Sequence, residues 1–286
     1  NIKLESLDKD YITLKEDSRL FQIYLPLKGF PSHILRSGDS KVTKMRRVKN
    51  GVELEYNVLT SSKGEFQVSA VVSVRSNPDG TFSFYLEIAN NTDITIPQVL
   101  FPTLGGLGPV KDKETDWFLL GREKIHPFKE LVIPDETVAF LDLQLQKYYR
   151  YPSFEMPMKW CDFGNASDGL TLFSKELTCD VQGVYIERLG RNKDSLAISW
   201  VLYPHIKPDE RWKSPEFIIY PHAGGWNVGA TKYKEFTDAH IKPVESPKFL
   251  NESVGFWTVW MTTPCGETNF DKPTFKFSDL PNLALE

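Results

Sequence analysis

The sequence predicts a mostly β protein, a large sandwich of two antiparallel sheets, and three observations lead to this fold class. Apolar and polar residues alternate with period two through most of the first 220 residues, which is typical of strands with one buried face. Turn sequences such as Asn50-Gly51 separate the runs, and short turns join antiparallel neighbours. The chain of 286 residues, 41% of them hydrophobic, is also long enough to bury a large core.

The predicted strands are defined by their apolar faces. In residues 51–58, Leu54, Tyr56 and Val58 share one face, and acidic and amide side chains share the other. The other apolar faces are Phe66, Val68, Ala70, Val72 and Val74; Phe82, Phe84, Leu86 and Ile88; Leu141, Leu143 and Leu145; and Leu196, Ile198, Trp200 and Leu202. Further turns are expected at Lys63-Gly64, Asn77-Pro78-Asp79-Gly80 and Asp168-Gly169. Since composition does not change along the way, one sandwich domain is expected over residues 1–222.

Two stretches interrupt the alternation and are predicted to be loops. Residues 101–109 are rich in glycine and proline, and residues 148–160 form a long aromatic stretch. Loops that expose aromatic rings are candidate ligand surfaces.

The period changes after residue 222. Trp226, Ala230, Tyr233, Phe236 and His240 lie on one side of a predicted helix, which two prolines then end, so residues 223–250 are expected to form a linker helix and loop. The nearly continuous apolar run over residues 254–261 is typical of a strand covered on both faces, as in a barrel. A helix start follows over residues 278–284. Residues 251–286 are therefore predicted to be the first β-α element of a truncated catalytic barrel.

Composition limits the partners and the compartment. Basic and acidic residues number 34 and 38 and are mixed along the chain, so nucleic acid is excluded as a partner. No apolar run is long enough to span a membrane. The N-terminus lacks a signal-peptide pattern, so we expect either a secreted or periplasmic protein whose leader has been removed or a cytoplasmic one. Cys161, Cys179 and Cys265 are too few for a disulfide framework or a zinc site; free, mostly buried thiols are favoured over a Cys161–Cys179 bridge.

No complete set of catalytic residues is recognisable. The chain has no phosphate-binding glycine loop, nucleophile elbow or metal-binding histidine pair, so no catalytic residue, metal or cofactor is predicted. The acidic residues Asp112, Glu114 and Asp116 could ligate calcium, but a solvated loop is favoured because the glycine and terminal Glu of a calcium loop are missing.

Individual residues could still contact a ligand. His222 follows Tyr220-Pro221 at a strand end, where it could contact a ligand or anchor a loop, and His240, on the helix stripe, is expected to be a core residue. Trp117, Trp160, Trp212 and Trp226 could each stack on a sugar ring or pack in the core.

Three segments of the sequence resemble a known group of proteins. YPHAGGWNVGATKYKEF (220–236), FLNESVGF (249–256) and FSDLP (277–281) are similar to an uncharacterised bacterial glycoside-hydrolase-like family. In that family a galactose-mutarotase-like β-supersandwich is joined by a helix to a TIM barrel. Family members often carry an acid and a His around the tryptophan, where this chain has Gly225 and Asn227, and a Trp in place of Phe236.

The resemblance implies the N-terminal, non-catalytic supersandwich domain of a carbohydrate-active enzyme, a glycoside hydrolase. The domain would support its own C-terminal barrel and shape the substrate cleft, and Trp160, His222 and Trp226 are the predicted carbohydrate-binding residues. The first alternative is a mutarotase- or epimerase-like enzyme that uses a His/Glu pair on the sandwich, and the second is a carbohydrate-binding module. A His and a Glu facing one sugar position in a concave pocket would favour the enzyme.

Overall fold

The structure is a computed structural model. It describes residues 5–6, 9–10, 19–27, 33–120, 125–127, 146–154, 156–188 and 195–242, together with 245, 247, 248 and 252. The contacts within the chain divide it into two units, Asn1–Ile241 and Lys242–Glu286. Three predicted segments, Leu141–Leu145, Val254–Met261 and residues 278–284, lie outside the described residues, so the barrel element remains a prediction.

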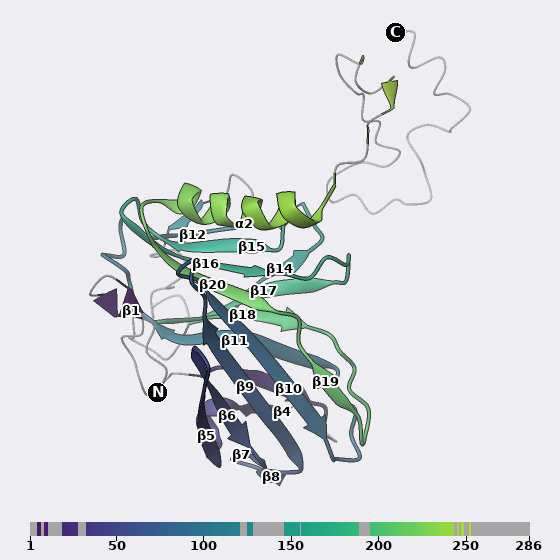
Figure 1. The fold of residues 1–286 in the computed structure, drawn as a ribbon. Coiled ribbons are helices and arrows are strands. Elements are labelled where there is room, and N and C mark those ends of the chain that lie inside the picture. Colours follow the sequence, from purple (N-terminus) through teal and green to yellow (C-terminus); the bar gives the residue numbers. More distant parts are fainter. Residues whose placement is uncertain are drawn as a thin grey trace, which may run out of the picture. The chain divides into compact units, whose positions relative to one another are not determined.

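Two antiparallel sheets dominate the first unit (Figure 1). The larger sheet contains, in spatial order, β13 (Ile125–Pro127), β12 (Trp117–Leu119), β15 (Trp160–Gly164), β16 (Asp168–Ser174), β20 (Phe217–Ala223), β10 (Phe82–Asn90), β9 (Val68–Ser76), β6 (Gly51–Tyr56) and β5 (Lys44–Val48). β19 (Arg211–Lys213) also pairs with β10. The smaller sheet contains β14 (Gln146–Tyr151), β17 (Gln182–Arg188), β18 (Leu196–Leu202), β11 (Gln98–Leu107), β3 (Gln22–Leu25) and β4 (His33–Arg36).

Two short hairpins and two helices complete the described elements. The hairpins are β1 (Glu5–Ser6) with β2 (Lys9–Asp10) and β7 (Leu59–Ser61) with β8 (Gly64–Phe66). The helices are η2 (Ser37–Asp39), a single 3-10 turn, and α2 (Trp226–His240).

The inner faces of the two sheets pack on each other and form the main core. Phe217 of the larger sheet contacts both Phe101 and Trp200 of the smaller one, with ring centroids 5.9 and 5.6 Å apart. Phe21, just before β3, meets Tyr56 of β6 edge to face at 5.3 Å. Such aromatic pairs add to the free energy gained by removing apolar surface from water. The prediction of a large two-sheet antiparallel sandwich is confirmed.

The period-two pattern positioned several strands correctly. Val68, Ala70, Val72 and Val74 of β9 are buried, and the intervening residues face outward. β10 continues from β9 through the predicted turn, in which Gly80 has a positive φ of 81°. Asn50, with φ of 58°, likewise forms the predicted turn between β5 and β6.

Three turn or loop predictions are wrong. Residues 98–107 form the central strand β11, because register irregularities after Leu100 and Gly105 let the ladder resume around the proline and the glycines. Residues 148–151 of the aromatic stretch belong to β14, which pairs with β17, and Trp160 opens β15, so the loop is shorter than predicted. Asp168-Gly169 begins β16, and the turn lies one step earlier, at Asn165–Ser167.

Helix α2 forms where it was predicted and covers the outer face of the larger sheet (Figure 1). Tyr233 and Phe236 pack on Phe173 of β16, with centroids 5.4 and 5.9 Å apart, as expected for the apolar stripe. Trp226, which the same stripe predicts to pack as well, is the first residue of α2 and is 42% exposed. His240 is also exposed and not a core residue; in the last turn, its Nδ1 lies 2.8 Å from the Phe236 carbonyl.

Candidate functional site

The outer face of the larger sheet beneath α2 is built from three cross-strand rows. Trp160, Phe173 and Ile218 lie side by side on β15, β16 and β20 and form the apolar row under Tyr233 and Phe236. The next row is Asp162, Thr171 and Tyr220, and the last is Gly164, Gly169 and His222. Because side chains alternate along each strand, Cys161, Phe163 and Leu172 point into the main core instead. The covered face therefore changes from apolar to polar toward one end of α2.

Three polar side chains of this face, which we call the Asp–His–Thr cluster, form a buried network. His222 Nε2 lies 2.9 Å from Asp162 Oδ2, and the Thr171 hydroxyl donates to the same carboxylate oxygen at 2.5 Å. Thr171 Oγ1 also lies 3.2 Å from His222 Nε2. Asp162 Oδ1 and His222 Nδ1 are buried without a hydrogen-bond partner.

Two glycines make room for the cluster and close it. A Cβ on Gly169 would lie 2.4 Å from His222 Cε1, so the imidazole rests directly on the β16 backbone. A Cβ on Gly229 of α2 would lie 1.7 Å from Thr171 Oγ1 and 2.8 Å from Asp162 Oδ2. The helix backbone thus seals the cluster, and a substrate cannot reach the His222–Asp162 pair while α2 is in place.

The sequence-predicted binding residues lie in different environments. Trp160 is 2% exposed and His222 is 3% exposed, both beneath α2, so neither presents a free surface to a sugar ring. Of the three predicted residues only Trp226 is open to solvent. The structure therefore does not bring them together as one open site.

An open pocket of about 480 Å³ lies near the start of α2, and its residues come from the loop before β12 and the turn before β16. It is lined by Lys111, Glu114, Thr115, Asp116, Trp117, Asn165, Ala166 and Ser167, which we call the Trp117 pocket. Gly224 N donates to the Ser167 carbonyl at 2.5 Å, which ties the segment before α2 to the rim.

Buried hydrogen bonds hold the Trp117 pocket in shape. Asp116 is 1% exposed; it accepts from the Lys111 backbone at 3.0 Å and from the Asn165 side chain at 2.9 Å. Asp112 instead caps its own turn by accepting from the Thr115 hydroxyl and from the backbone of Thr115 and Glu114. These bonds, above all the one from the Thr115 hydroxyl, lower the pKa of its carboxyl group. The acidic residues therefore do not converge on one point, and no metal-binding group is found among the described residues.

An indole, an amide and several hydroxyls around one hollow can stack on the apolar face of a sugar ring and hydrogen-bond its hydroxyls. The sequence alone indicates Trp117 as a stacking candidate and Asp116 as one of three closely spaced acidic residues. The sequence gives no sign that Asn165, 49 residues after Asp116 in the chain, hydrogen-bonds the Asp116 side chain and lines the same pocket as Trp117.

Lys159 is a further buried charged residue and anchors a loop. Its ammonium group donates to the Thr178 carbonyl at 2.6 Å and to the Glu176 carboxylate at 3.2 Å, and it lies 5.0 Å from the Tyr151 ring. These partners satisfy a buried ammonium group, so Lys159 is a structural residue. Cys161 and Cys179 are free thiols, the first buried as expected and the second exposed, and Cys265 lies outside the described residues.

Comparisons with known proteins yield structural likenesses only. No protein-family model and no curated sequence matches the chain. A variant of the GH36 alpha-galactosidase AgaA from Geobacillus stearothermophilus, in complex with stachyose, is 12% identical with a TM-score of 0.44, over 82% of this chain and 31% of that one. The alpha-galactosidase from Lactobacillus brevis is 10% identical with a TM-score of 0.43, over 67% and 27%. The Slr1438 protein from Synechocystis is 13% identical with a TM-score of 0.40, over 69% and 74%.

The chain thus spans less than a third of the length of these alpha-galactosidases. In the described part of the chain, no helix has both the length and the apolar character needed to cross a membrane.

Proposed function

We propose that residues 1–241 form a non-catalytic sandwich domain of a carbohydrate-active enzyme, a glycoside hydrolase. In this proposal the domain supports a catalytic barrel and shapes one side of its substrate cleft. The resemblance of residues 220–281 to the glycoside-hydrolase-like family motivates the carbohydrate part.

The proposal that the domain is non-catalytic rests on the sealed Asp–His–Thr cluster. A general acid or base must come within hydrogen-bond reach of the substrate proton, and His222 and Asp162 are each 1% exposed at the side chain. Among the described side chains, no histidine is paired with a glutamate. A mutarotase-like mechanism would need such a pair on an open concave face, and the described part of the sandwich offers none.

The Trp117 pocket is the proposed point of contact with sugar. Its wall combines the Trp117 ring with hydroxyl, amide and charged side chains, the mixture that fixes the orientation of a saccharide. It lies on the side of the domain from which α2 begins, where Trp226 adds an exposed indole to the half-buried ring of Trp117.

The full 286-residue chain can be tested for catalysis and for binding. We expect no hydrolysis of aryl glycosides and no acceleration of galactose mutarotation. We also expect neutral oligosaccharides to shift the NMR signals of the tryptophan side chains. Trp117→Phe, which keeps an apolar ring, should weaken this binding by about tenfold because the wider stacking surface is lost.

Each outcome bears on one alternative. Mutarotation that is lost in His222→Gln would overturn the proposal in favour of the enzyme. Binding that is unaffected by Trp117→Phe and abolished by Trp226→Ala would move the contact from the pocket to the helix. Failure of all neutral and acidic oligosaccharides to bind would contradict the carbohydrate role.

A further inference from the structure

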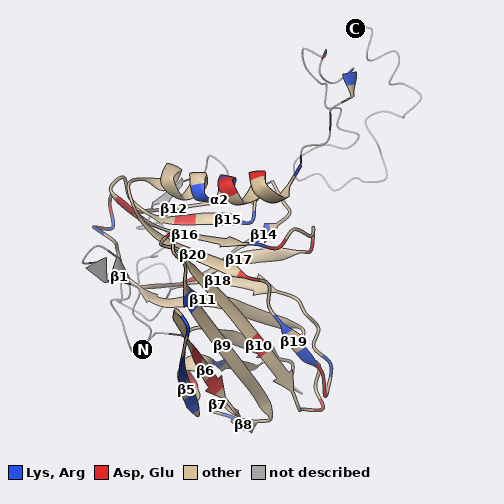
Figure 2. Ribbon diagram, viewed as in Figure 1, with Lys and Arg blue, Asp and Glu red and all other residues tan. Residues whose placement is uncertain are grey.

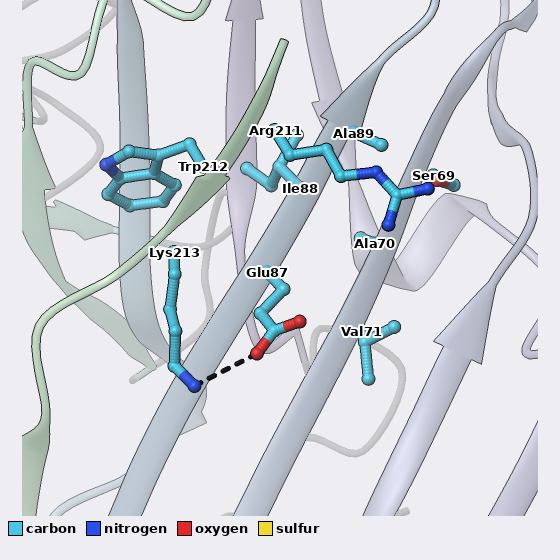
Figure 3. A pocket seen from close by; sticks show the side chains of 9 residues that line it. All are labelled: Ser69, Ala70, Val71, Glu87, Ile88, Ala89, Arg211, Trp212 and Lys213. Atoms are coloured by element: carbon cyan, nitrogen blue, oxygen red, sulfur yellow. Dashed lines mark ion pairs between the residues drawn. The ribbon is translucent and has the colours of Figure 1, made fainter.

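A second hollow lies on the outer face of the larger sheet, where α2 does not cover it. β9, β10 and β19 form its floor and sides, and its volume is about 310 Å³ (Figure 3). Ser69, Ala89 and Arg211 are cross-strand neighbours, and the two small side chains create the hollow between longer ones. In the next row Val71, Glu87 and Lys213 are neighbours and form one side. We call this hollow the Arg211 groove.

The groove contains two cationic groups and one carboxylate. Lys213 Nζ lies 3.0 Å from Glu87 Oε1 and 5.6 Å from the centre of the Tyr85 ring. Arg211 is exposed and forms no ion pair with any described residue. Figure 3 shows its guanidinium reaching across β10 toward Ser69 on β9. The groove therefore keeps one unpaired cation over a floor of small side chains.

Other arginines on this outer face are neutralised. Arg46 pairs with Glu53 and with Glu55, and Arg75 lies 3.6 Å from Glu53. Figure 2 shows these charges of both signs on β5 and β6, with basic residues on β19. Arg211 differs because its cross-strand neighbour is Ala89, which offers no carboxylate.

We propose that the Arg211 groove binds the anionic group, a carboxylate or a sulfate, of an acidic saccharide. The anionic part of the proposal rests on the groove alone, and the saccharide part rests on the proposed function. A guanidinium can hold a carboxylate or sulfate through two parallel hydrogen bonds. Lys213 adds a second positive charge, and the Ser69 hydroxyl can hydrogen-bond a further oxygen. The volume of the groove is at the lower end of the range for small-molecule sites, which suits one charged sugar unit.

The test measures binding of three probes to the full chain by NMR titration: a trigalacturonate, a neutral galactose trisaccharide and the dicarboxylate glutarate. Trigalacturonate should bind more tightly than the neutral trisaccharide, and its affinity should fall as the salt concentration rises. Arg211→Ala should weaken trigalacturonate binding by about tenfold. Glu87→Gln should strengthen it by about threefold, because a like charge leaves the groove. Arg47→Ala is the matched control, since Arg47 is an exposed arginine on β5, at the far edge of the sheet.

A general loss of folding would weaken trigalacturonate binding in both variants, so it would not produce opposite effects of Arg211→Ala and Glu87→Gln. Equal affinity for the acidic and neutral trisaccharides, or equal effects of Arg211→Ala and Arg47→Ala, would overturn the inference and leave the proposed function standing. If glutarate bound as tightly as trigalacturonate and its binding also depended on Arg211, the result would support an anion site in the groove and contradict a saccharide as its ligand.

Discussion

His222 Nε2 lies 2.9 Å from Asp162 Oδ2, and helix α2 covers the pair so that each side chain is 1% exposed. This pair joins β15 to β20 across β16, the three strands on which the helix lies. A polar pair in such a place is retained only with good hydrogen bonds, because removing it from water is costly. We therefore regard the pair as a structural link between β15 and β20 beneath α2.

Removing the carboxylate of this pair should destabilise the domain. Asp162→Ala leaves His222 Nε2 and the Thr171 hydroxyl without their shared acceptor, and each is buried. The free energy of unfolding should fall by about 1–3 kcal/mol, measured by urea denaturation. Asp93→Ala, at an exposed carboxylate, should change it by less than about 0.5 kcal/mol. If Asp162→Ala and Asp93→Ala had the same free energy of unfolding, the His222–Asp162 pair would make no net contribution to stability.

The Gly229→Ala variant tests how closely α2 approaches the sheet. In an exposed helix this change stabilises by about 1 kcal/mol. Here the new Cβ would lie 1.7 Å from Thr171 Oγ1, so we expect a destabilisation of about 1–3 kcal/mol instead. Adding Thr171→Ala removes the clashing oxygen and should recover part of the loss in a double-mutant cycle. Additive effects of the two changes would argue against this contact.

The two ends of the helix stripe should respond differently to truncation. Phe236→Ala removes a half-buried ring that packs on Phe173, and it should cost about 2 kcal/mol, less than for a fully buried ring. Trp226→Ala, at an exposed ring, should leave the free energy of unfolding within about 0.5 kcal/mol of the original. If Trp226→Ala cost as much as Phe236→Ala, the first turn of α2 would be packed as the sequence pattern predicted.

Local patterns predicted the sandwich well, because burial of one face imposes a period of two along a strand such as β9. They failed at β11, which is buried on both faces and whose Pro102 and Gly106 match no period. For the same reason β15 and β16 are not marked as special in the sequence, although α2 covers their outer face and the other sheet their inner face. Which face a helix will cover is a tertiary property that one sequence does not display.

The candidate sites depend even more on tertiary contacts. The sequence predicts a ligand contact or a loop anchor for His222, but nothing in it indicates the partner Asp162, which lies 60 residues earlier. Ser69 falls within a predicted strand and Ala89 lies just after one, and only cross-strand register places both in one row with Arg211. Gly229 offered a usable signal: a glycine inside a helix lowers its stability, so close approach of another backbone or side chain is a reason for its presence.

The two described cysteines should differ in reactivity. Cys179 is exposed, whereas Cys161 is buried in the main core, where burial raises the pKa of its thiol. Since the thiolate is the reactive form, iodoacetamide should modify Cys179 readily and Cys161 only after unfolding. Peptide mapping by mass spectrometry distinguishes the two sites. Rapid modification of Cys161 in the folded chain would contradict its placement under the smaller sheet.

The raised pKa of Cys161 also predicts how stability changes with pH. Below the ordinary thiol pKa of 9.0, both the folded and the unfolded chain hold a neutral thiol, so this group leaves stability unchanged. Above it the unfolded chain loses the proton and the folded chain retains it, so the free energy of unfolding falls by up to about 1.4 kcal/mol per pH unit. Buried tyrosines such as Tyr56, whose pKa is also raised by burial, add a similar loss above pH 10.0. Urea denaturation between about pH 8 and about pH 10 should therefore show a smaller decline for Cys161→Ala than for the original chain. Identical slopes would mean that the Cys161 thiol titrates alike in both states.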